Sequence, residues 1–227
     1  MSFNILIADE HTLIRRGILS MINTMSAENA TFDATHFNIV GETDSPLELV
    51  SLLSHQHVDI LFLGFTLNTR RSQSPVSELD GTALVKWLAR KFPETRIVLL
   101  SPYRNNTIIR MALEAGAKGY ISRNTCERML WRAITTVLDG EVYIERGLMD
   151  SLFRRDAPDS QELTLRENDV LRMLCRGLSL TAISGKMNLS IKTISAHKLR
   201  AMQKLGVQTD CQLYCLLAQT RMFDIAI

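Results

Sequence analysis

Five short apolar runs recur through the first 145 residues, and an amphipathic segment follows each of them. The runs are Ile5–Ala8, Phe37–Val40, Ile60–Leu63, Ile97–Leu100 and Gly119–Ile121. They are too continuous for a sheet with one solvated face, so we expect strands that are buried on both faces. The segments near 11–24, 46–55, 81–92, 104–115 and 125–139 have the apolar period of helices. Five β/α units in series predict an α/β doubly wound, parallel five-stranded sheet with helices on both faces.

The residues that follow these strands are the candidates for a functional site. The crevice of a doubly wound sheet opens at the carboxyl ends of its strands. Asp9 and Glu10 follow the first run, Gly64 the third, Ser101 the fourth and Arg123 the fifth. We therefore expect these five residues to lie close together at one edge of the sheet.

Together with Gly81 and the segment 115–120, this layout resembles the receiver domain of response regulators, which is flavodoxin-like. The resemblance implies an acidic pair and a phospho-accepting aspartate that hold Mg²⁺, with a Ser or Thr and a Lys on the phosphoryl group. Gly64 stands at the place of the aspartate and Arg123 at that of the lysine. Glycine offers no nucleophile, and Asp9 and Glu10 alone make a poor octahedral site. We expect a pseudo-receiver with no metal, no other cofactor and no enzymatic activity, whose degenerate phosphorylation pocket is Asp9, Glu10, Gly64, Ser101 and Arg123.

Alternatives stay open around this pocket. Asp9 and Glu10 either pair with Arg123 or retain some metal binding. Asp59 begins the third run, at the wrong end of the strand for a displaced acceptor, and is otherwise a surface carboxylate. The long segment 68–80 contains two arginines and a proline, and either binds an anion or a partner or is disordered.

The segment 163–207 has the pattern of short helices joined by tight turns. Gly177 can end one helix, and Leu180, Ile183 and Met187 recur at helical spacing in the next. Ser190, after the turn at 188–189, can cap a third helix. In that helix we expect Ile191, Ile194, Met202 and Leu205 to face the core. We expect the outer surface to hold Lys192, Thr193, Ser195, Ala196, Lys198, Leu199 and Lys204.

The order of these residues resembles the LuxR/NarL type of DNA-binding domain, and the segment 189–207 is similar to its RcsB-like branch. The chain departs from the pattern at Ser184, where many members have alanine, and at Leu199, a place often held by a cation. The resemblance implies a small all-α, four-helix helix-turn-helix domain. We expect phosphate contacts from Lys192, Thr193 and Lys198 and base-edge contacts from Ser195, Ala196 and Leu199. The full set of expected DNA-binding residues is Thr181, Lys192, Thr193, Ser195, Ala196, Lys198, Leu199 and Lys204. The alternative for a single basic amphipathic helix is a solvated face.

Charge divides unevenly along the chain, in agreement with two parts of different function. Residues 163–227 contain nine Lys and Arg against four Asp and Glu, whereas residues 1–149 contain fifteen against sixteen. The positive part is the one with the helix-turn-helix pattern, which suits a phosphate-binding module. We expect a receiver-like domain over 1–142, a linker with a helix over 143–161 and the DNA-binding domain over 162–227.

A last helix is expected over 211–222, and family resemblance implies a dimer contact through Leu213, Leu216 and Leu217. The same leucines alternatively complete the core of the small domain. No run of 18 apolar residues and no signal-peptide pattern is present, so we expect no membrane contact and a cytoplasmic location. The four cysteines lack metal-ligand spacing with histidines.

These features predict a sequence-specific transcriptional regulator, an atypical response regulator that aspartyl phosphorylation does not activate. Its expected partners are double-stranded DNA and either a second copy of itself or an RcsB-like regulator. The alternative function is that of a protein that heterodimerises with an RcsB-type regulator and modulates or sequesters it.

Overall fold

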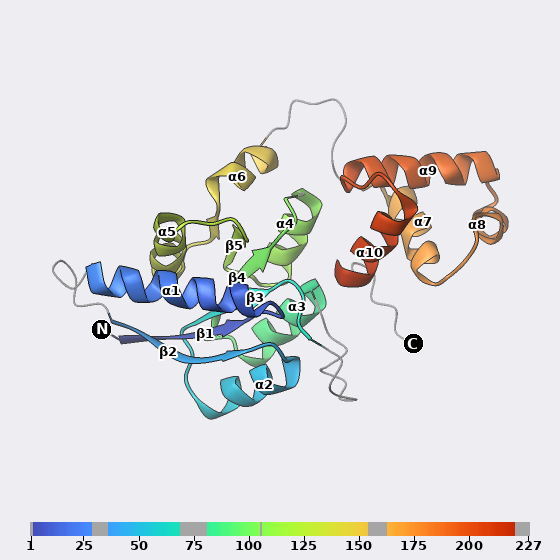
Figure 1. Cartoon of the computed structure of the whole chain (residues 1–227). Coiled ribbons are helices and arrows are strands. Elements are labelled where there is room, and N and C mark those ends of the chain that lie inside the picture. The colour runs from blue at the N-terminus through green and yellow to red at the C-terminus, as the bar shows by residue number, and fades with distance from the viewer. Residues whose placement is uncertain (1, 29–35, 69–80, 105, 154–162, 221–227) are drawn as a thin grey trace.

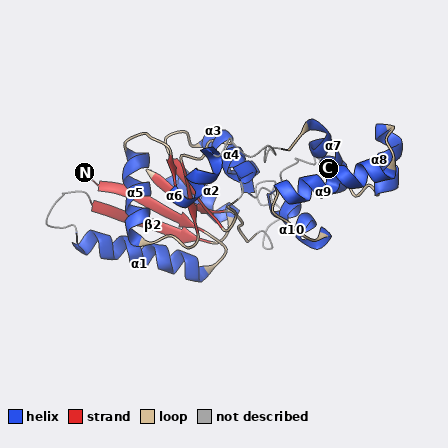
Figure 2. Ribbon diagram, turned by 90° about the horizontal axis from the view of Figure 1, so that it is seen from above, coloured by secondary structure: helices blue, strands red, loops and turns tan. Residues whose placement is uncertain are grey.

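The amino-terminal part of the computed structural model is a parallel sheet covered by helices on both faces (Figures 1 and 2). The structure describes residues 2–28, 36–68, 81–104, 106–153 and 163–220. The strands lie in the order β2-β1-β3-β4-β5-β6, and every pair is parallel. Their bounds are β1 Ser2–Ala8, β2 His36–Thr43, β3 Ile60–Gly64, β4 Arg96–Ser101, β5 Gly119–Ser122 and β6 Tyr143–Ile144.

The expectation of a doubly wound parallel sheet is confirmed, but the sheet has six strands rather than five. The extra strand, β6, is only two residues long, and Tyr143 and Ile144 pair with Gly119 and Tyr120 of β5. So short a strand leaves no apolar run in the sequence, and it exists because β5 offers a free edge. The sequence assigned these two residues to the linker.

Alternation along the central strands divides the apolar residues between two layers. One face of the sheet, with Ile5, Ile7, Ile60 and Phe62, packs against α1 and α5. The other face, with Leu6, Leu61 and Leu63, packs against the remaining helices of this part of the chain. The helix bounds are α1 Thr12–Glu28, α2 Pro46–His55, α3 Gly81–Lys91, α4 Asn106–Glu114, α5 Glu127–Leu138 and α6 Arg146–Phe153.

The carboxyl-terminal part is a group of four short helices, which confirms the predicted all-α domain. They are α7 Leu165–Cys175, α8 Leu180–Met187, α9 Ile191–Lys204 and α10 Asp210–Thr220. Hydroxyl caps fix three of the starts: Thr164, Ser179 and Ser190 each accept a hydrogen bond from a backbone N–H in the first turn. α8 ends at Asn188, whose φ of 51° turns the chain sharply into α9. The caps and the turn therefore set α8 and α9 as a helix-turn-helix pair.

The two parts touch, because α10 contacts α3 and the apolar cluster on that face of the sheet continues into the four helices. None of the helices in the described ranges is long and apolar enough to cross a membrane. The segment 68–80, apart from Asn68, lies outside the described residues, so its expected role stays a prediction.

Candidate functional site

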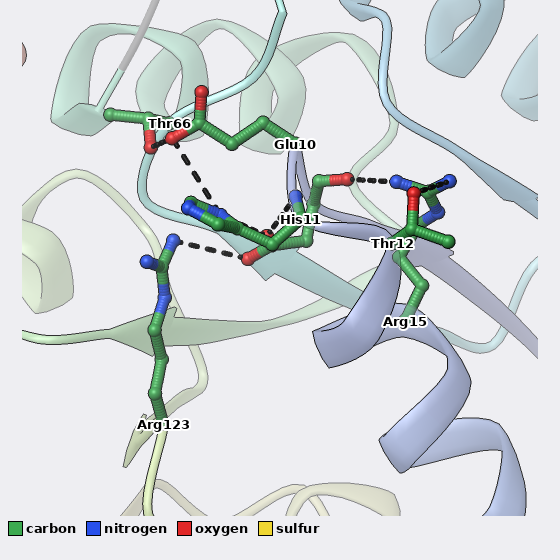
Figure 3. A network of polar contacts seen from close by, with 7 residues as sticks. Glu10, His11, Thr12, Arg15, Thr66 and Arg123 are labelled. Atoms are coloured by element: carbon green, nitrogen blue, oxygen red, sulfur yellow. Dashed lines mark hydrogen bonds and ion pairs between the residues drawn. The ribbon is translucent and has the colours of Figure 1, made fainter.

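At the carboxyl ends of the strands, Asp9 contacts Arg123 and lies against Gly64. Figure 3 shows Glu10, His11, Thr66 and Arg123 near one another at this edge of the sheet. The Asp9 side chain is completely buried after β1. Its Oδ1 accepts a hydrogen bond of 2.8 Å from the His11 backbone N–H and lies 3.0 Å from His11 Nδ1. Its Oδ2 accepts one of 3.3 Å from Arg123 Nη2. The carboxylate is thus satisfied by groups of this chain on both of its oxygens.

Gly64, the last residue of β3, lies directly against this carboxylate. A Cβ built on Gly64 would lie 2.3 Å from Asp9 Oδ2 and 2.7 Å from Asp9 Cγ. Carbon and oxygen atoms that are not bonded do not approach so closely. The Asp9 carboxylate therefore occupies the space in which any side chain at position 64 would begin.

The second acidic residue, Glu10, has other partners. It accepts a hydrogen bond from the Thr66 hydroxyl, and His11 Nδ1 lies 3.8 Å from one of its oxygens. Arg15 Nη1 donates to the Asp9 carbonyl oxygen at 2.7 Å. Within the described residues, no group of three or more His, Cys, Asp or Glu side chains is placed to hold a metal ion. Asp9 thus pairs with Arg123 and Glu10 with Thr66, and the His11 ring lies near both carboxylates.

Ser101 and Tyr120 anchor the loop after β4. The Ser101 side chain is buried, and its hydroxyl accepts a hydrogen bond of 3.1 Å from the Tyr103 N–H. The Tyr120 hydroxyl donates to the Tyr103 carbonyl at 2.9 Å, and burial raises the pKa of Tyr120 above its usual range. Ser101 lies at the edge where the sequence places it, but its hydroxyl already binds the backbone of its own loop.

Asp59 precedes β3 at the opposite end from Gly64. It accepts a hydrogen bond of 2.8 Å from the Asn4 N–H and lies 3.1 Å from His57 Nε2. Asp59 is therefore a structural carboxylate at the amino ends of the strands. The crevice lies at the opposite, carboxyl ends.

On α8 and α9, the structure divides the expected DNA-binding residues into two groups. Lys192 and Leu199 are exposed, as is Thr181 on α8, and Thr193, Ser195 and Ala196 are half-buried. The Ser190 hydroxyl caps the helix by accepting from the Thr193 N–H at 3.1 Å. This surface is available to a ligand.

Two lysines expected on the outer surface of α9 are instead tied to the protein, so that expectation is wrong for Lys198 and Lys204. Lys198 is 9% exposed, and its ammonium lies 2.5 Å from Asp210 at the start of α10. Lys204 Nζ donates to the buried Glu167 carboxylate at 2.9 Å. Helical periodicity could not reveal these partners, because Asp210 and Glu167 belong to other helices. Conversely, Ile191, expected in the core, is 48% exposed because it lies at the helix tip beyond the core.

The expected dimer contact on α10 is also corrected. Leu213, Leu216 and Leu217 are 0%, 4% and 4% exposed, and they belong to the apolar core of the described chain. The structure thus supports the alternative, that these leucines complete the core. The outer face of α10 instead presents Cys211, Gln212, Tyr214, Cys215 and Ala218.

Sequence reasoning missed several residues of the crevice and of the lysine pairs. They are His11, Arg15 and Thr66 around the acidic pair, and Glu167 and Asp210 as lysine partners. Of these residues, His11 was the easiest to predict from the sequence, because it directly follows the acidic pair. The others are separated in sequence from the groups they bind, and no local pattern identifies them.

Comparison with known proteins shows which family this chain belongs to. Residues 5–135 match the response regulator receiver domain, and residues 161–217 match the bacterial regulatory proteins of the luxR family. The chain is 27% identical over 220 residues to the oxygen regulatory protein NreC of Staphylococcus aureus, covering 92% of this chain and 94% of that one.

Solved structures of RcsB are similar over nearly the whole chain. Two RcsB dimers bound to two parallel DNAs give a TM-score of 0.75 at 26% identity, covering 96% of this chain and 99% of RcsB. RcsB from Salmonella enterica serovar Typhimurium, bound to promoter rprA in the presence of the phosphomimetic BeF3-, gives 0.73 at 26% identity, covering 97% and 100%. The chain belongs to the luxR family of DNA-binding response regulators, with a receiver domain followed by a helix-turn-helix domain.

Proposed function

We propose that this protein is a transcriptional regulator that binds a specific DNA sequence without activation by aspartyl phosphorylation. One observation carries the second half of the proposal: position 64 is a glycine whose side-chain space is filled by the Asp9 carboxylate. An acyl phosphate needs a carboxylate nucleophile, and glycine has none. The Arg123 guanidinium forms an ion pair with Asp9 and balances its charge. In this protein, that pair takes the place of an ion pair between the residue at position 123 and a phosphoryl group.

For DNA, we propose that α9 enters the major groove with its exposed and half-buried residues. Lys192 and Thr193 contact phosphates, and Ser195, Ala196 and Leu199 face the base edges. Thr181, at the start of α8, contacts the sugar-phosphate backbone of the DNA. Lys198 and Lys204 support the helix from within the domain, since Asp210 and Glu167 already hold their ammonium groups.

The experiment compares DNA affinity with and without phosphoryl donors. The full chain is used to select duplexes from a random pool, and the dissociation constant of a selected site is then measured. Acetyl phosphate with Mg²⁺, and beryllofluoride with Mg²⁺, should leave both the affinity and the oligomeric state unchanged, and intact-protein mass spectra should show no phosphoryl adduct. RcsB serves as the positive control for the reagents. An adduct, or a gain in affinity with beryllofluoride, contradicts phosphorylation independence.

The second candidate is a protein that pairs with an RcsB-type regulator and alters its output. The observation that favours it is that solved structures of RcsB similar to this chain include dimers bound to DNA. Sedimentation of the chain with RcsB, and gel shifts of each alone and of the mixture, separate the two candidates. Tight pairing with RcsB and weak DNA binding by the chain alone would favour the second candidate.

A further inference from the structure

The outward face of α9 carries one stripe of residues that differs from the rest of the helix. Lys192, Ser195, Ala196 and Leu199 are spaced by three, four and seven residues, which places them on one side of an α-helix. Leu199 is 56% exposed in the chain. Ala196 precedes it by three residues and is half-buried. The middle of the stripe is therefore small and apolar, and its only cation stands at the amino-terminal end.

Two neighbouring lysines are held away from this stripe. Lys198 turns to Asp210 and Lys204 to Glu167, so neither ammonium lies on the stripe. Arg200 is exposed and follows Ala196 by four residues, so it borders the stripe beside Ala196, about 100° around the helix from Leu199. Asn, Gln and Arg, which like Lys read bases through hydrogen bonds, do not occur between Lys192 and Leu199.

The major groove offers one apolar group to such a surface, the 5-methyl group of thymine. We infer that Leu199, with Ala196 beside it, reads the thymine 5-methyl group and makes thymine a determinant of the DNA site. The inference rests on the proposed docking of α9 in the major groove. It deepens that proposal by naming the chemical group that gives the site its sequence preference.

The test removes the methyl group and nothing else. Sites are selected from a random duplex pool with the full chain, and each thymine of a selected site is replaced in turn by deoxyuridine, which keeps every hydrogen-bonding group. At one thymine or more, the replacement should weaken binding about fourfold, which is the loss expected when one methyl group is no longer buried. The Leu199→Ala chain should show a thymine-to-uracil ratio near one at the same position.

A matched variant separates this effect from general affinity. Lys192→Ala, on the same stripe, should weaken binding to thymine and uracil duplexes equally, because a phosphate contact does not sense the methyl group. Selected sites that bind with full affinity after every thymine replacement overturn the inference, as does a uracil penalty that persists in Leu199→Ala. A pool from which the chain selects no site overturns the proposed DNA function itself, so the two failures are distinguishable.

Discussion

At the scale of single residues, Gly64 has the largest consequences in the crevice. It carries no nucleophile, and the absence of its Cβ lets the Asp9 carboxylate approach the backbone of β3 and reach Arg123. A side chain at this position and the buried Asp9–Arg123 pair cannot coexist as they stand. The lack of a side chain at position 64 therefore explains how the Asp9 carboxylate comes to lie against β3.

Gly64→Ala should consequently lower the free energy of unfolding by roughly 1–3 kcal/mol, the usual cost of overpacking. Gly17→Ala is the matched control, because nothing lies within 4 Å of a Cβ built at Gly17 inside α1. There alanine should raise stability by about 0.5–1 kcal/mol. Urea unfolding of both variants measures the difference, and an unchanged stability of Gly64→Ala would show that Asp9 moves aside freely.

At the scale of elements, α7 depends on a capping box that also holds α9. Thr164 accepts a hydrogen bond from the Glu167 N–H, while the Glu167 carboxylate accepts from the Thr164 N–H at 2.8 Å and from Lys204 Nζ. Burial of Glu167 opposes its ionisation, but these hydrogen bonds together outweigh burial and lower its pKa. One carboxylate therefore joins the start of α7 to the end of α9.

A carboxyl group with a lowered pKa stabilises the folded state above its unfolded pKa, near 4.3. This contribution is lost as the pH falls through the folded value. We expect the stability of the four-helix domain to decline below about pH 4.3, and Glu167→Gln to be less stable at pH 7 with a shallower acid decline. Urea unfolding followed by circular dichroism across pH 2–7 measures this. If the unchanged protein and Glu167→Gln lose stability equally steeply as the pH falls, Glu167 does not cause the acid decline.

The two faces of α10 should respond differently to the same substitution. Leu216→Asp places a charge in the core and should cost about 3 kcal/mol or more. Tyr214→Asp lies on the exposed face and should change stability by no more than about 0.5 kcal/mol. Thermal melts compare the variants, and sedimentation reports whether Tyr214→Asp loses self-association. A Leu216→Asp protein that is stable but monomeric would show that Leu216 forms the dimer contact rather than part of the core.

At the scale of the whole molecule, charge separates the two domains. The excess of Lys and Arg lies after residue 163, whereas the receiver part is nearly neutral. Within the DNA-binding part, however, Lys198 and Lys204 form ion pairs with acidic residues of the same domain. We therefore expect fewer phosphate contacts than the composition of this part suggests.

Salt titration of DNA binding should distinguish these cations. Lys192→Ala should reduce the slope of log affinity against log salt by about one unit, because one phosphate contact is lost. Lys198→Ala should leave the slope unchanged and lower stability by about 1 kcal/mol, through the lost ion pair and the packing of its stem. Lys118→Ala, exposed in the receiver domain, is the control and should change neither quantity. A reduced slope for Lys198→Ala would show that this lysine contacts a DNA phosphate after all.

The sequence by itself determined the buried strands, the parallel sheet, the four helices, the cap at Ser190 and the glycine at position 64. These features depend on local periodicity and on single residue types, which neighbours in the chain suffice to define. Only the tertiary structure decided the two-residue strand β6, the partners of Lys198 and Lys204, the inward leucines of α10 and the place of the Asp9 carboxylate. Each of these depends on a contact between elements far apart in the chain. Periodicity shows that a residue lies on one side of a helix, but only packing shows what lies opposite it.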